Sequence, residues 1–527
     1  MRVGKPYRLS VPIWHYVVAA VATCIASTGS LQAAVRIHPL FTNHAVLQRE
    51  LNVPVWGTAD TGEEVTVEYG KHRVRTVAKD GRWMVKLPPM KASAQGQTLR
   101  VKGPHNHVDV QDVVVGEVWI CSGQSNMEWS MAQSHKPDAD IAASASTQLR
   151  FFTVTKRRSV EAKTDLDYAP HSWVLAGPET TRRFSAVGYY FGRDLAKALP
   201  GVPIGMIHTS WGGSPAEVWM RRAVLEDDAE YAAKIIAPAV KSQNAWSESV
   251  SAWEKRKADA AAKGTEFKEG RPGQPWNPGE LYGGMIANLI PYGIRGAIWY
   301  QGESNAGRAW QYRSLFGDMI RNWRRDWGQG NFPFYAVQLA PWDKNRKRDL
   351  AVIASEIGES DWAELREAQN HVAETLSNVD VAVITDVGDK DDIHPGLKGP
   401  VGERLARLAR AQVYHQDILA HGPRLQSAEF NDSEVRLTFK DAGAGLSTSN
   451  GADVHGFLVA GSDRRWHPAR VQIRDGNTLV LESSSVTRPV AVRYGWNDHP
   501  VLNLVNSDGL PATPFRTDSW PVSTQGR

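Results

Sequence analysis

The chain has 527 residues, of which 42% are hydrophobic and 22% charged, and its formal net charge is +4 at pH 7. This composition is typical of a globular protein, and the length exceeds what one ordinary core organises, so two or three domains are expected. The small charge offers no extended basic surface, which argues against nucleic acid and anionic membranes as partners.

The N-terminus has the three parts of a secretory signal peptide. An apolar stretch over residues 11–25 is preceded by basic residues and followed by the small-residue end "SLQAA". We therefore predict a signal peptide over residues 1–34, cleaved near Ala33 or Ala34, and export to the periplasm or the extracellular space. An uncleaved anchor is disfavoured because the stretch is short, and lipid attachment at Cys24 because the bulkier Thr23 precedes it.

Cleavage changes two properties of the chain. It removes three basic residues (Arg2, Lys5 and Arg8) and no acidic ones, so the net charge falls from +4 to +1. No membrane association is expected after cleavage. Cys121 becomes the last remaining cysteine, so no intrachain disulfide is possible and the fold must depend on its core.

Both ends of the mature chain have the pattern of antiparallel β-structure. Residues 35–112 contain short segments rich in Val, Thr and aromatics, separated by turn residues, such as "VPVWG", "EEVTVEYG" and "RWMVKLP". Residues 424–527 repeat this texture in "EVRLTFK", "NTLVLES" and "PVAVRYGW". We predict a sandwich-like N-terminal β-region and a C-terminal β-region.

In the middle of the chain, residues 113–423, the apolar residues recur with a different period. Apolar runs typical of buried strands ("VWIC", "IGMIH", "GAIWY", "FYAVQL", "VAVITD") alternate with segments in which apolar residues recur every three or four positions. This alternation predicts a three-layer α/β/α sandwich around a parallel sheet. Residues 221–280 fit this pattern poorly and are interpreted as a helical and loop insertion, either a lid or padding.

Polar side chains follow four of the predicted strands. After "VWIC" comes Ser-Gly-Gln-Ser-Asn, which contains Ser125; after "IGMIHTSW" come Gly212 and Gly213; after "GAIWY" come Gln301 and Glu303; after "VAVITDVGD" comes a segment ending in His394. Ligands of parallel sheets bind beyond the carboxyl ends of the strands. A hydroxyl, an imidazole, carboxylates and unhindered amides at one edge are the parts of a serine hydrolase.

Each of these residues also has an ordinary structural interpretation. Ser125 and Glu128 have the spacing of a helix capping box, so Ser125 could be a cap, a nucleophile or both. Gly212 and Gly213 could be turn glycines, and His394 a solvated loop residue. Their co-occurrence at successive strand ends favours catalysis.

Four blocks make the chain resemble a known family. "GEVWICSGQSNM", "SWGGSPAEVW", "IWYQGESNA" and "DIHPGLKGPVGERLA" are similar to blocks of the sialate O-acetylesterase family of the SGNH hydrolase superfamily. The similarity extends to residues 44–67 and 492–518, so it covers nearly all of the mature chain. It implies an SGNH-type fold and a serine carbohydrate esterase that needs no cofactor and no metal.

The resemblance also assigns roles to individual residues. It implies that Ser125 is the nucleophile, that His394 is the general base, and that Asp391, in the superfamily's Asp-x-x-His pattern, orients the histidine. The neighbours Asp389 and Asp392 keep the identity of this acid open. The oxyanion hole is expected to use the Ser125 amide, an amide of Gly212 or Gly213, and the side-chain amide of Gln301.

The substrate implied is an acetylated oligo- or polysaccharide, either O-acetyl sialic acid or a hemicellulose such as xyloglucan or xylan. No arginine cluster offers a clamp for the sialic acid carboxylate, which favours a neutral polysaccharide. We expect substrate contacts from Glu303, Asn305 and the rings of Trp129 and Trp211. One departure from the family lies near this region, where "LYGGM" has Gly283 in place of an asparagine.

Two other function classes remain open. A glycoside hydrolase would use Glu303 with Asp391 or Asp392 as its pair of carboxylates, and Ser125 would then be dispensable. A non-catalytic carbohydrate-binding protein would keep the β-regions without needing the triad. The sequence leaves the oligomeric state undetermined.

Overall fold

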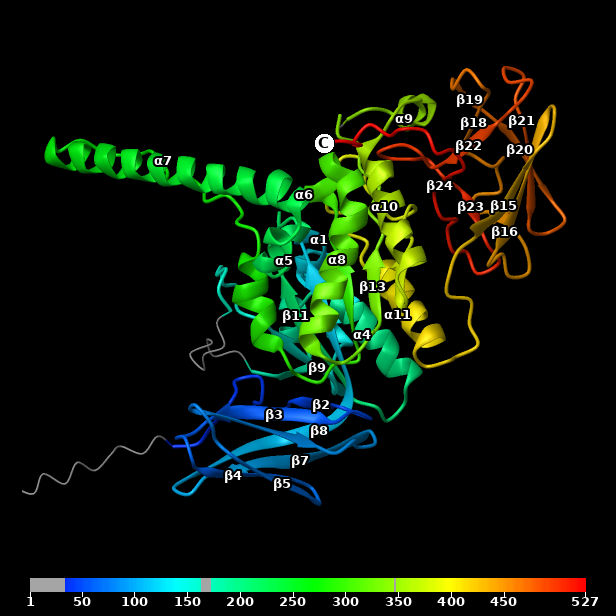
Figure 1. The fold of residues 1–527 in the computed structure, drawn as a ribbon. Helices are drawn as coiled ribbons and strands as arrows, with labels where there is room; N and C mark the ends of the chain where they lie inside the picture. The colour runs from blue at the N-terminus through cyan, green and yellow to red at the C-terminus, as the bar shows by residue number, and fades with distance from the viewer. Residues whose placement is uncertain (1–33, 163–171, 346) are drawn as a thin grey trace, which may run out of the picture.

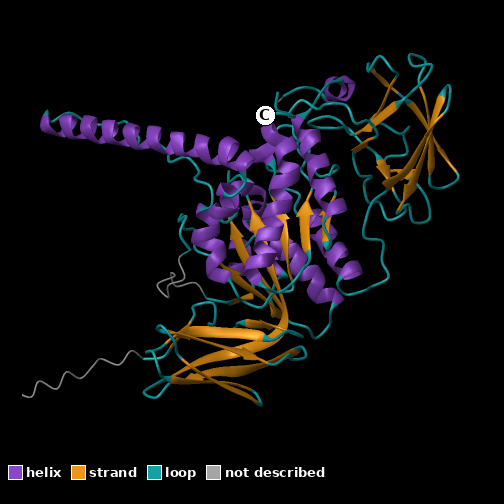
Figure 2. Ribbon diagram, in the orientation of Figure 1, coloured by secondary structure: helices purple, strands orange, loops and turns teal. Residues whose placement is uncertain are grey.

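A computed structural model describes residues 34–162, 172–345 and 347–527 (Figure 1). Residues 1–33 of the predicted signal peptide lie outside the described residues. Three units follow one another along the chain: an N-terminal β-unit, a central α/β unit and a C-terminal β-unit (Figure 2). The predicted fold class, an SGNH-type α/β unit flanked by antiparallel β-regions, is confirmed.

The N-terminal unit is built from two facing sheets. One sheet has the order β1-β3-β6, and the other pairs β4 with β5 and β7, β7 with β8, and β8 with β2. Buried valines and leucines from the alternating strands, such as Val55, Val67 and Leu99, fill the space between the sheets. The strands are β1 (Arg36–Ile37), β2 (Val46–Gln48), β3 (Val53–Thr58), β4 (Glu64–Tyr69), β5 (His72–Val77), β6 (Arg82–Leu87), β7 (Ser93–Lys102) and β8 (His107–Gly123).

Strand β8 joins the first two units. Its first half pairs with β7 and β2, and its second half, from Glu117 onward, pairs in parallel with β11 and β12. The boundary expected between residues 112 and 113 therefore falls within one continuous strand. Because the strand is held on both sides in the central sheet, the position of its carboxyl end is rigidly fixed.

The central sheet has the order β10-β9-β11-β8-β12-β13-β14. All neighbours are parallel except the edge pair β10 and β9. Chain order reverses at β8, whose neighbours β11 and β12 both follow it in sequence, so a ligand crevice is expected at its carboxyl end. The additional strands are β9 (Ser146–Thr153), β10 (Val174–Ala176), β11 (Ile204–Ser210), β12 (Gly296–Tyr300), β13 (Phe334–Val337) and β14 (Val379–Ala382).

Helices cover both faces of this sheet (Figure 2). Helices α4 (Ala186–Ala198) and α11 (Gly399–Gln412) pack with Trp119, Ile298 and Tyr335 of one face. Helices α8 (Ala309–Trp327) and α10 (Asp361–Thr375) pack with Ile120, Trp299 and Phe334 of the other. Successive strand residues thus enter opposite cores, as the alternation of a two-sided sheet requires.

The remaining helical segments are short, with one exception. Helix α7 (Ala237–Ala262), in the predicted insertion, projects from the body of the protein (Figure 1), and Val250 is its one buried residue. The others are α1 (Ser125–Glu128), α2 (Asp138–Ala142), α3 (Pro178–Arg183), α5 (Arg222–Glu226), α6 (Ala229–Tyr231), α9 (Leu350–Ser355), η1 (Met131–Gln133), η2 (Ala216–Trp219), η3 (Ala232–Ile236), η4 (Tyr282–Ile286), η5 (Ala287–Leu289) and η6 (Glu303–Arg308).

The C-terminal unit has its own core between antiparallel sheets, with the orders β15-β16-β21-β20, β19-β18-β22-β24 and β17-β23. The strands are β15 (Arg424–Phe430), β16 (Glu434–Lys440), β17 (Ser447–Thr448), β18 (Phe457–Ala460), β19 (Trp466–Pro468), β20 (Arg470–Arg474), β21 (Thr478–Glu482), β22 (Ala491–Tyr494), β23 (Leu504–Val505) and β24 (Phe515–Arg516).

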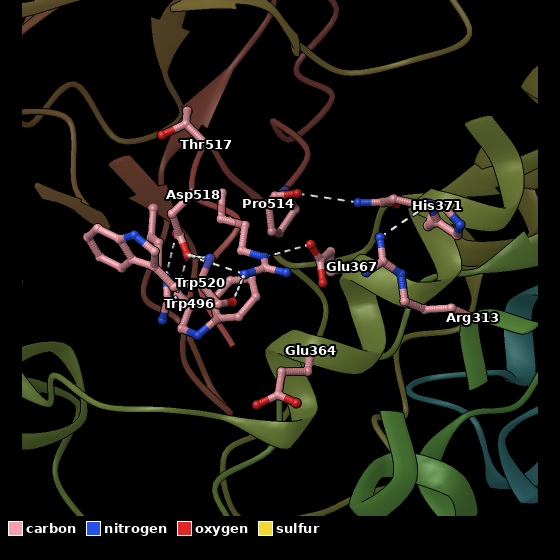
Figure 3. Close-up of polar contacts among 12 residues, drawn as sticks. Arg313, Glu364, Glu367, His371, Trp496, Pro514, Thr517, Asp518 and Trp520 are labelled. Atoms are coloured by element: carbon pink, nitrogen blue, oxygen red, sulfur yellow. Dashed lines mark hydrogen bonds and ion pairs between the residues drawn. The ribbon is translucent and has the colours of Figure 1, made fainter. Parts of the chain in front are cut away.

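Polar contacts attach this unit to helix α10 (Figure 3). Arg516 Nε donates to Glu367 at 2.7 Å, and Asn370 donates to the Pro514 carbonyl at 3.3 Å. Glu364 accepts the backbone amides of Ser523 and Thr524 at 2.9 and 3.0 Å. Leu365, Ala368 and Val372 of the same helix pack in the core beneath the central sheet, so α10 connects the C-terminal unit to that sheet.

No helix among the residues that the structure describes is both long enough and apolar enough to cross a bilayer.

Candidate active site

Ser125 lies where β8 ends and α1 begins. The turn requires Gly123, whose φ is +139° and where an added Cβ would stand 2.1 Å from the Tyr300 carbonyl oxygen. Gln124 occupies the N-cap position and Ser125 is the first helical residue. Ser125 is therefore not a capping residue, and Glu128 does not complete a capping box.

The structure brings His394 to Ser125. His394 Nε2 lies 2.8 Å from Ser125 Oγ, although 268 residues separate them along the chain. Burial lowers the pKa of His394, the nearby Asp392 carboxylate raises it, and the Lys398 ammonium lowers it further. A neutral imidazole near pH 7 can accept the proton of the serine hydroxyl, which is the requirement for a general base.

The position of the third triad member differs from the expectation. The Asp391 carboxylate accepts from Lys390 Nζ at 2.6 Å and from the Lys347 amide at 2.8 Å. Asp392 Oδ1 instead lies 3.6 Å from His394 Nδ1 and accepts the His394 backbone amide at 2.8 Å. The geometry therefore favours Asp392, because adjacent residues of this loop point in different directions.

Trp129 packs on the histidine. The two rings are stacked at 15° with centroids 5.0 Å apart, and Trp129 Nε1 donates to the Gln133 carbonyl at 2.8 Å. One face of Trp129 is covered by the imidazole, so stacking of a sugar on this ring, as expected from the sequence, would have to use the other face. In this position Trp129 restricts the orientation of the ring of His394.

The two glycines after β11 differ in their surroundings. A Cβ added to Gly212 would lie 3.4 Å from Ser125 Cβ, so this backbone is close to the serine. The Gly212 amide donates to Glu128 Oε2 at 2.7 Å, and the other oxygen of Glu128 is bonded to Lys156. Gly213 is exposed, with φ +72°. Gly212 is thus the better candidate for an oxyanion donor, once Glu128 moves away from its amide.

Gln301 and Asn305 are buried, and their side chains are bonded to groups other than Ser125. Gln301 is fully buried; its Nε2 donates to Asn305 Oδ1 at 2.7 Å and its Oε1 accepts from Tyr312 at 2.8 Å. Asn305, also buried, accepts the Ala216 amide and donates to Glu217. The roles expected for Gln301 in the oxyanion hole and for Asn305 in substrate binding need correction, because both amides are used to hold adjacent loops together.

Glu303 is enclosed beside the nucleophile. Its Oε1 accepts from Asn126 Nδ2 at 2.6 Å, its Oε2 is buried without a partner, and burial raises its pKa. A carboxylate held in this way faces Asn126 and not an open cleft. This arrangement does not fit the pair of accessible carboxylates that a glycoside hydrolase requires.

Aromatic and paired charged groups surround the loop that carries Gly212. Trp211 contacts Trp276 at a right angle with centroids 5.6 Å apart, and Lys156 Nζ lies 5.3 Å from the Trp211 ring centroid. Trp276 comes from the predicted insertion, so this segment packs against the loop that follows β11. Arg158 packs over Trp276 and pairs with Glu280 at 2.7 Å.

The departure at Gly283 has a steric explanation. A Cβ at this position would lie 2.3 Å from the Ser159 carbonyl oxygen and 2.7 Å from that of Val160. An asparagine side chain could not be accommodated without moving this backbone. The 159–160 segment therefore occupies the space that a larger residue would fill.

Lys398 was not assigned a role from the sequence, Asn126 was expected to be structural, and Glu128 was considered only as part of a capping box. Lys398 is 1% exposed, and its Nζ donates to Asn126 Oδ1 at 2.5 Å. A lysine four residues after His394 in "HPGLK" was the available signal, but sequence spacing does not reveal burial. Residues 34–162, 172–345 and 347–527 contain no group of three or more His, Cys, Asp or Glu suited to a metal ion.

Comparison with known proteins identifies the family of this chain. The family model "carbohydrate esterase, sialic acid-specific acetylesterase" matches residues 115–253 and 258–410, which is more than half of the chain. The chain belongs to this family. It is therefore a carboxylic ester hydrolase, and its family supports deacetylation of sugars as the reaction.

Full-length relatives agree with this assignment. The sialate O-acetylesterase of Rattus norvegicus is 28% identical over 90% of this chain and 92% of its own length. That of Homo sapiens is 27% identical over 91% of this chain and 92% of its own. The crystal structure of a carbohydrate acetylesterase from Xanthomonas citri has a TM-score of 0.78 and 36% identity, covering 92% of this chain and all of that chain.

Proposed function

We propose that the protein is a secreted serine esterase that removes O-acetyl groups from neutral acetylated hemicelluloses through an acetyl-serine intermediate. The observation that carries the mechanism is the 2.8 Å distance between Ser125 Oγ and His394 Nε2 at the carboxyl end of β8. Secretion is inferred from the signal-peptide pattern of residues 1–34.

The reaction follows from the positions of these groups. His394 Nε2 accepts the Ser125 proton as Oγ attacks the acetyl carbonyl, and the resulting imidazolium then protonates the departing sugar oxygen. Water, deprotonated by His394, attacks the acetyl-serine and releases acetate. Amides of Ser125 and Gly212 would stabilise the alkoxide, at about 3 kcal/mol for each donor.

The preference for a neutral sugar rests on three cations, Lys156, Arg158 and Lys398, each of which already has a partner. Lys156 is bonded to Glu128, Arg158 is paired with Glu280, and Lys398 is buried against Asn126. A substrate carboxylate would have to displace an existing partner to bind any of these three cations. A neutral sugar needs no such exchange and can pack against the aromatic face of Trp211.

The test is acetate release from acetylated xyloglucan, acetylated xylan and O-acetyl sialic acid, measured for the wild type, Ser125→Ala and Ser122→Ala. Ser122 is the control because it lies three residues before Ser125, near the end of β8, and its side chain is fully buried away from substrate. Release from the two plant polysaccharides should vanish in Ser125→Ala and persist in Ser122→Ala. Undiminished release by Ser125→Ala would refute the mechanism, and release from O-acetyl sialic acid alone would refute the substrate.

A further inference from the structure

A buried hydrogen-bond network surrounds Asn126, the residue after the nucleophile. Asn126 is fully buried, and its Nδ2 donates to Glu303 Oε1 at 2.6 Å and to the Ile393 carbonyl at 3.0 Å. Its Oδ1 accepts from Lys398 Nζ at 2.5 Å. One side chain therefore connects the helix of Ser125, the loop after β12, the histidine loop and the start of α11.

Lys398 is an unusual member of this network. Its Nζ lies 5.3 Å from the ring centroid of Tyr300 and 5.9 Å from that of Trp129. Burial lowers the pKa of Lys398 to about 7, and the carboxylates of Glu303 and Asp392 oppose that decrease. An enclosed ammonium is costly unless neighbouring groups compensate for it, so this lysine has a specific environment and not merely a packing role.

Lys398 and Glu303 together fix the orientation of the Asn126 amide. In the observed orientation the NH₂ group faces two oxygen acceptors and the carbonyl oxygen faces an ammonium. A flipped amide would place its oxygen against the Glu303 carboxylate and the Ile393 carbonyl, which cannot donate. The ammonium and the carboxylate thus determine which atom of Asn126 meets the histidine loop.

The histidine needs such support. Asp392, which lies nearest to His394 Nδ1, has a side chain that is 56% exposed and is 3.6 Å away, beyond hydrogen-bond distance. The bond from Asn126 to Ile393 instead holds the backbone adjacent to His394. The general base is therefore restrained mainly by the stacked Trp129 and by this network.

We propose that Lys398 and Glu303 are positioning residues that act through Asn126 to hold His394 against Ser125. The inference rests on the function proposed above and adds two residues to it. Neither residue contacts the reacting atoms: each contributes by fixing the loop whose displacement would lengthen the distance between Ser125 and His394.

The test compares Lys398→Met and Glu303→Gln with the wild type. Lys398→Met removes the ammonium, and the expected result is a loss of about 100-fold in kcat with little change in KM, because misplacement of a catalytic group acts on the chemical step. Glu303→Gln keeps an acceptor for Asn126 and should lose less. Labelling of Ser125 by a small fluorophosphonate should slow in proportion, which measures the serine and histidine without a sugar.

The pH profile separates positioning from a general structural role. The charged groups that face His394 and Lys398 are Asp392 and Glu303, and Tyr300 stays neutral because burial raises its pKa. The Lys398 ammonium lowers the pKa of His394, so Lys398→Met should raise it. The acid limb of kcat/KM should then move to higher pH, which an unrelated loss of stability would not produce.

Lys241→Met, at an exposed position of α7, is the control and should behave as the wild type. The proposal would be overturned if folded Lys398→Met had the kcat, the labelling rate and the acid limb of kcat/KM of the wild type. An increase in KM at unchanged kcat would overturn it as well. If Lys398→Met does not fold, the proposal is tested with Asn126→Asp. This variant keeps the acceptor for Lys398 but loses the donor to the Ile393 carbonyl. Full activity of Asn126→Asp would refute the inference. Activity of Ser125→Ala would instead refute the proposed function itself.

Discussion

The acid that assists His394 can be identified by substituting two adjacent residues, Asp391→Asn and Asp392→Asn. The structure separates them clearly, since Asp391 is bonded to Lys390 and Lys347 whereas Asp392 Oδ1 is 3.6 Å from His394 Nδ1. Both substitutions remove one negative charge from the same exposed loop. Each variant is therefore the control for the other.

The expected magnitude follows from distance and solvent exposure. Two unit charges about 4 Å apart interact by about 1 kcal/mol in water and about 4 kcal/mol at an effective dielectric constant of 20. The Asp392 side chain is 56% exposed, so the lower part of this range applies. A cost of about 1–2 kcal/mol in the transition state corresponds to a loss of roughly 5-fold to 30-fold in kcat for Asp392→Asn.

This loss is far smaller than the roughly 10,000-fold that a buried, hydrogen-bonded triad aspartate contributes in serine proteases. The direction of the pH effect also follows. The Asp392 carboxylate raises the pKa of His394, so Asp392→Asn should lower that pKa and move the acid limb of kcat/KM to lower pH. Asp391→Asn should keep kcat within about twofold of the wild type, since its partners lie elsewhere.

The assay is steady-state acetate release between pH 4 and pH 9, with thermal unfolding measured on the same samples to confirm that both variants are folded. A loss of two or more orders of magnitude in Asp391→Asn, with Asp392→Asn nearly unaffected, would refute this reasoning. It would show that the triad acid is Asp391, as the Asp-x-x-His spacing predicts, and not Asp392, as the 3.6 Å distance to His394 Nδ1 indicates.

Two further substitutions test other parts of the site. Gln301→Ala should lower the free energy of unfolding by about 1–3 kcal/mol, because the buried Tyr312 hydroxyl loses its acceptor and Asn305 loses one of its donors. The kcat of the folded enzyme should fall less than 10-fold, whereas the roughly 100-fold loss typical of an oxyanion donor would contradict the structure. Gly123→Ala should reduce the yield of folded protein and its melting temperature, because the new Cβ would lie 2.1 Å from the Tyr300 carbonyl oxygen. A melting temperature equal to that of the wild type would be incompatible with this turn.

Local sequence determined the architecture to a large extent. Alternation of apolar and polar residues indicated the two β-units, and continuous apolar runs such as "GAIWY" indicated strands buried on both faces, since each pattern reflects which faces a strand must bury. Ser125 and His394 were found because strand ends and family blocks are both features of contiguous sequence. The spacing of residues within one helix or strand is fixed by backbone geometry, so the sequence predicts it without a tertiary structure.

The direction of each loop side chain was decided only by the tertiary structure. Asp391 and Asp392 are chemically identical neighbours, and their distinction depends on the course of the loop around Lys347 and His394. Gln301 was expected at the oxyanion hole, but its partners are Asn305 and Tyr312.

The sequence also did not predict which polar side chains are buried or which pairs of them form hydrogen bonds across long sequence distances. Asn126 meets Glu303 177 residues later and Lys398 272 residues later, and nothing local marks Lys398 as buried. Sequence records propensity and spacing within an element, whereas the pairing of polar groups from distant elements is set by how those elements pack. For that reason the sequence alone indicated where the chemistry lies, and only the folded structure showed which side chains hold it in place.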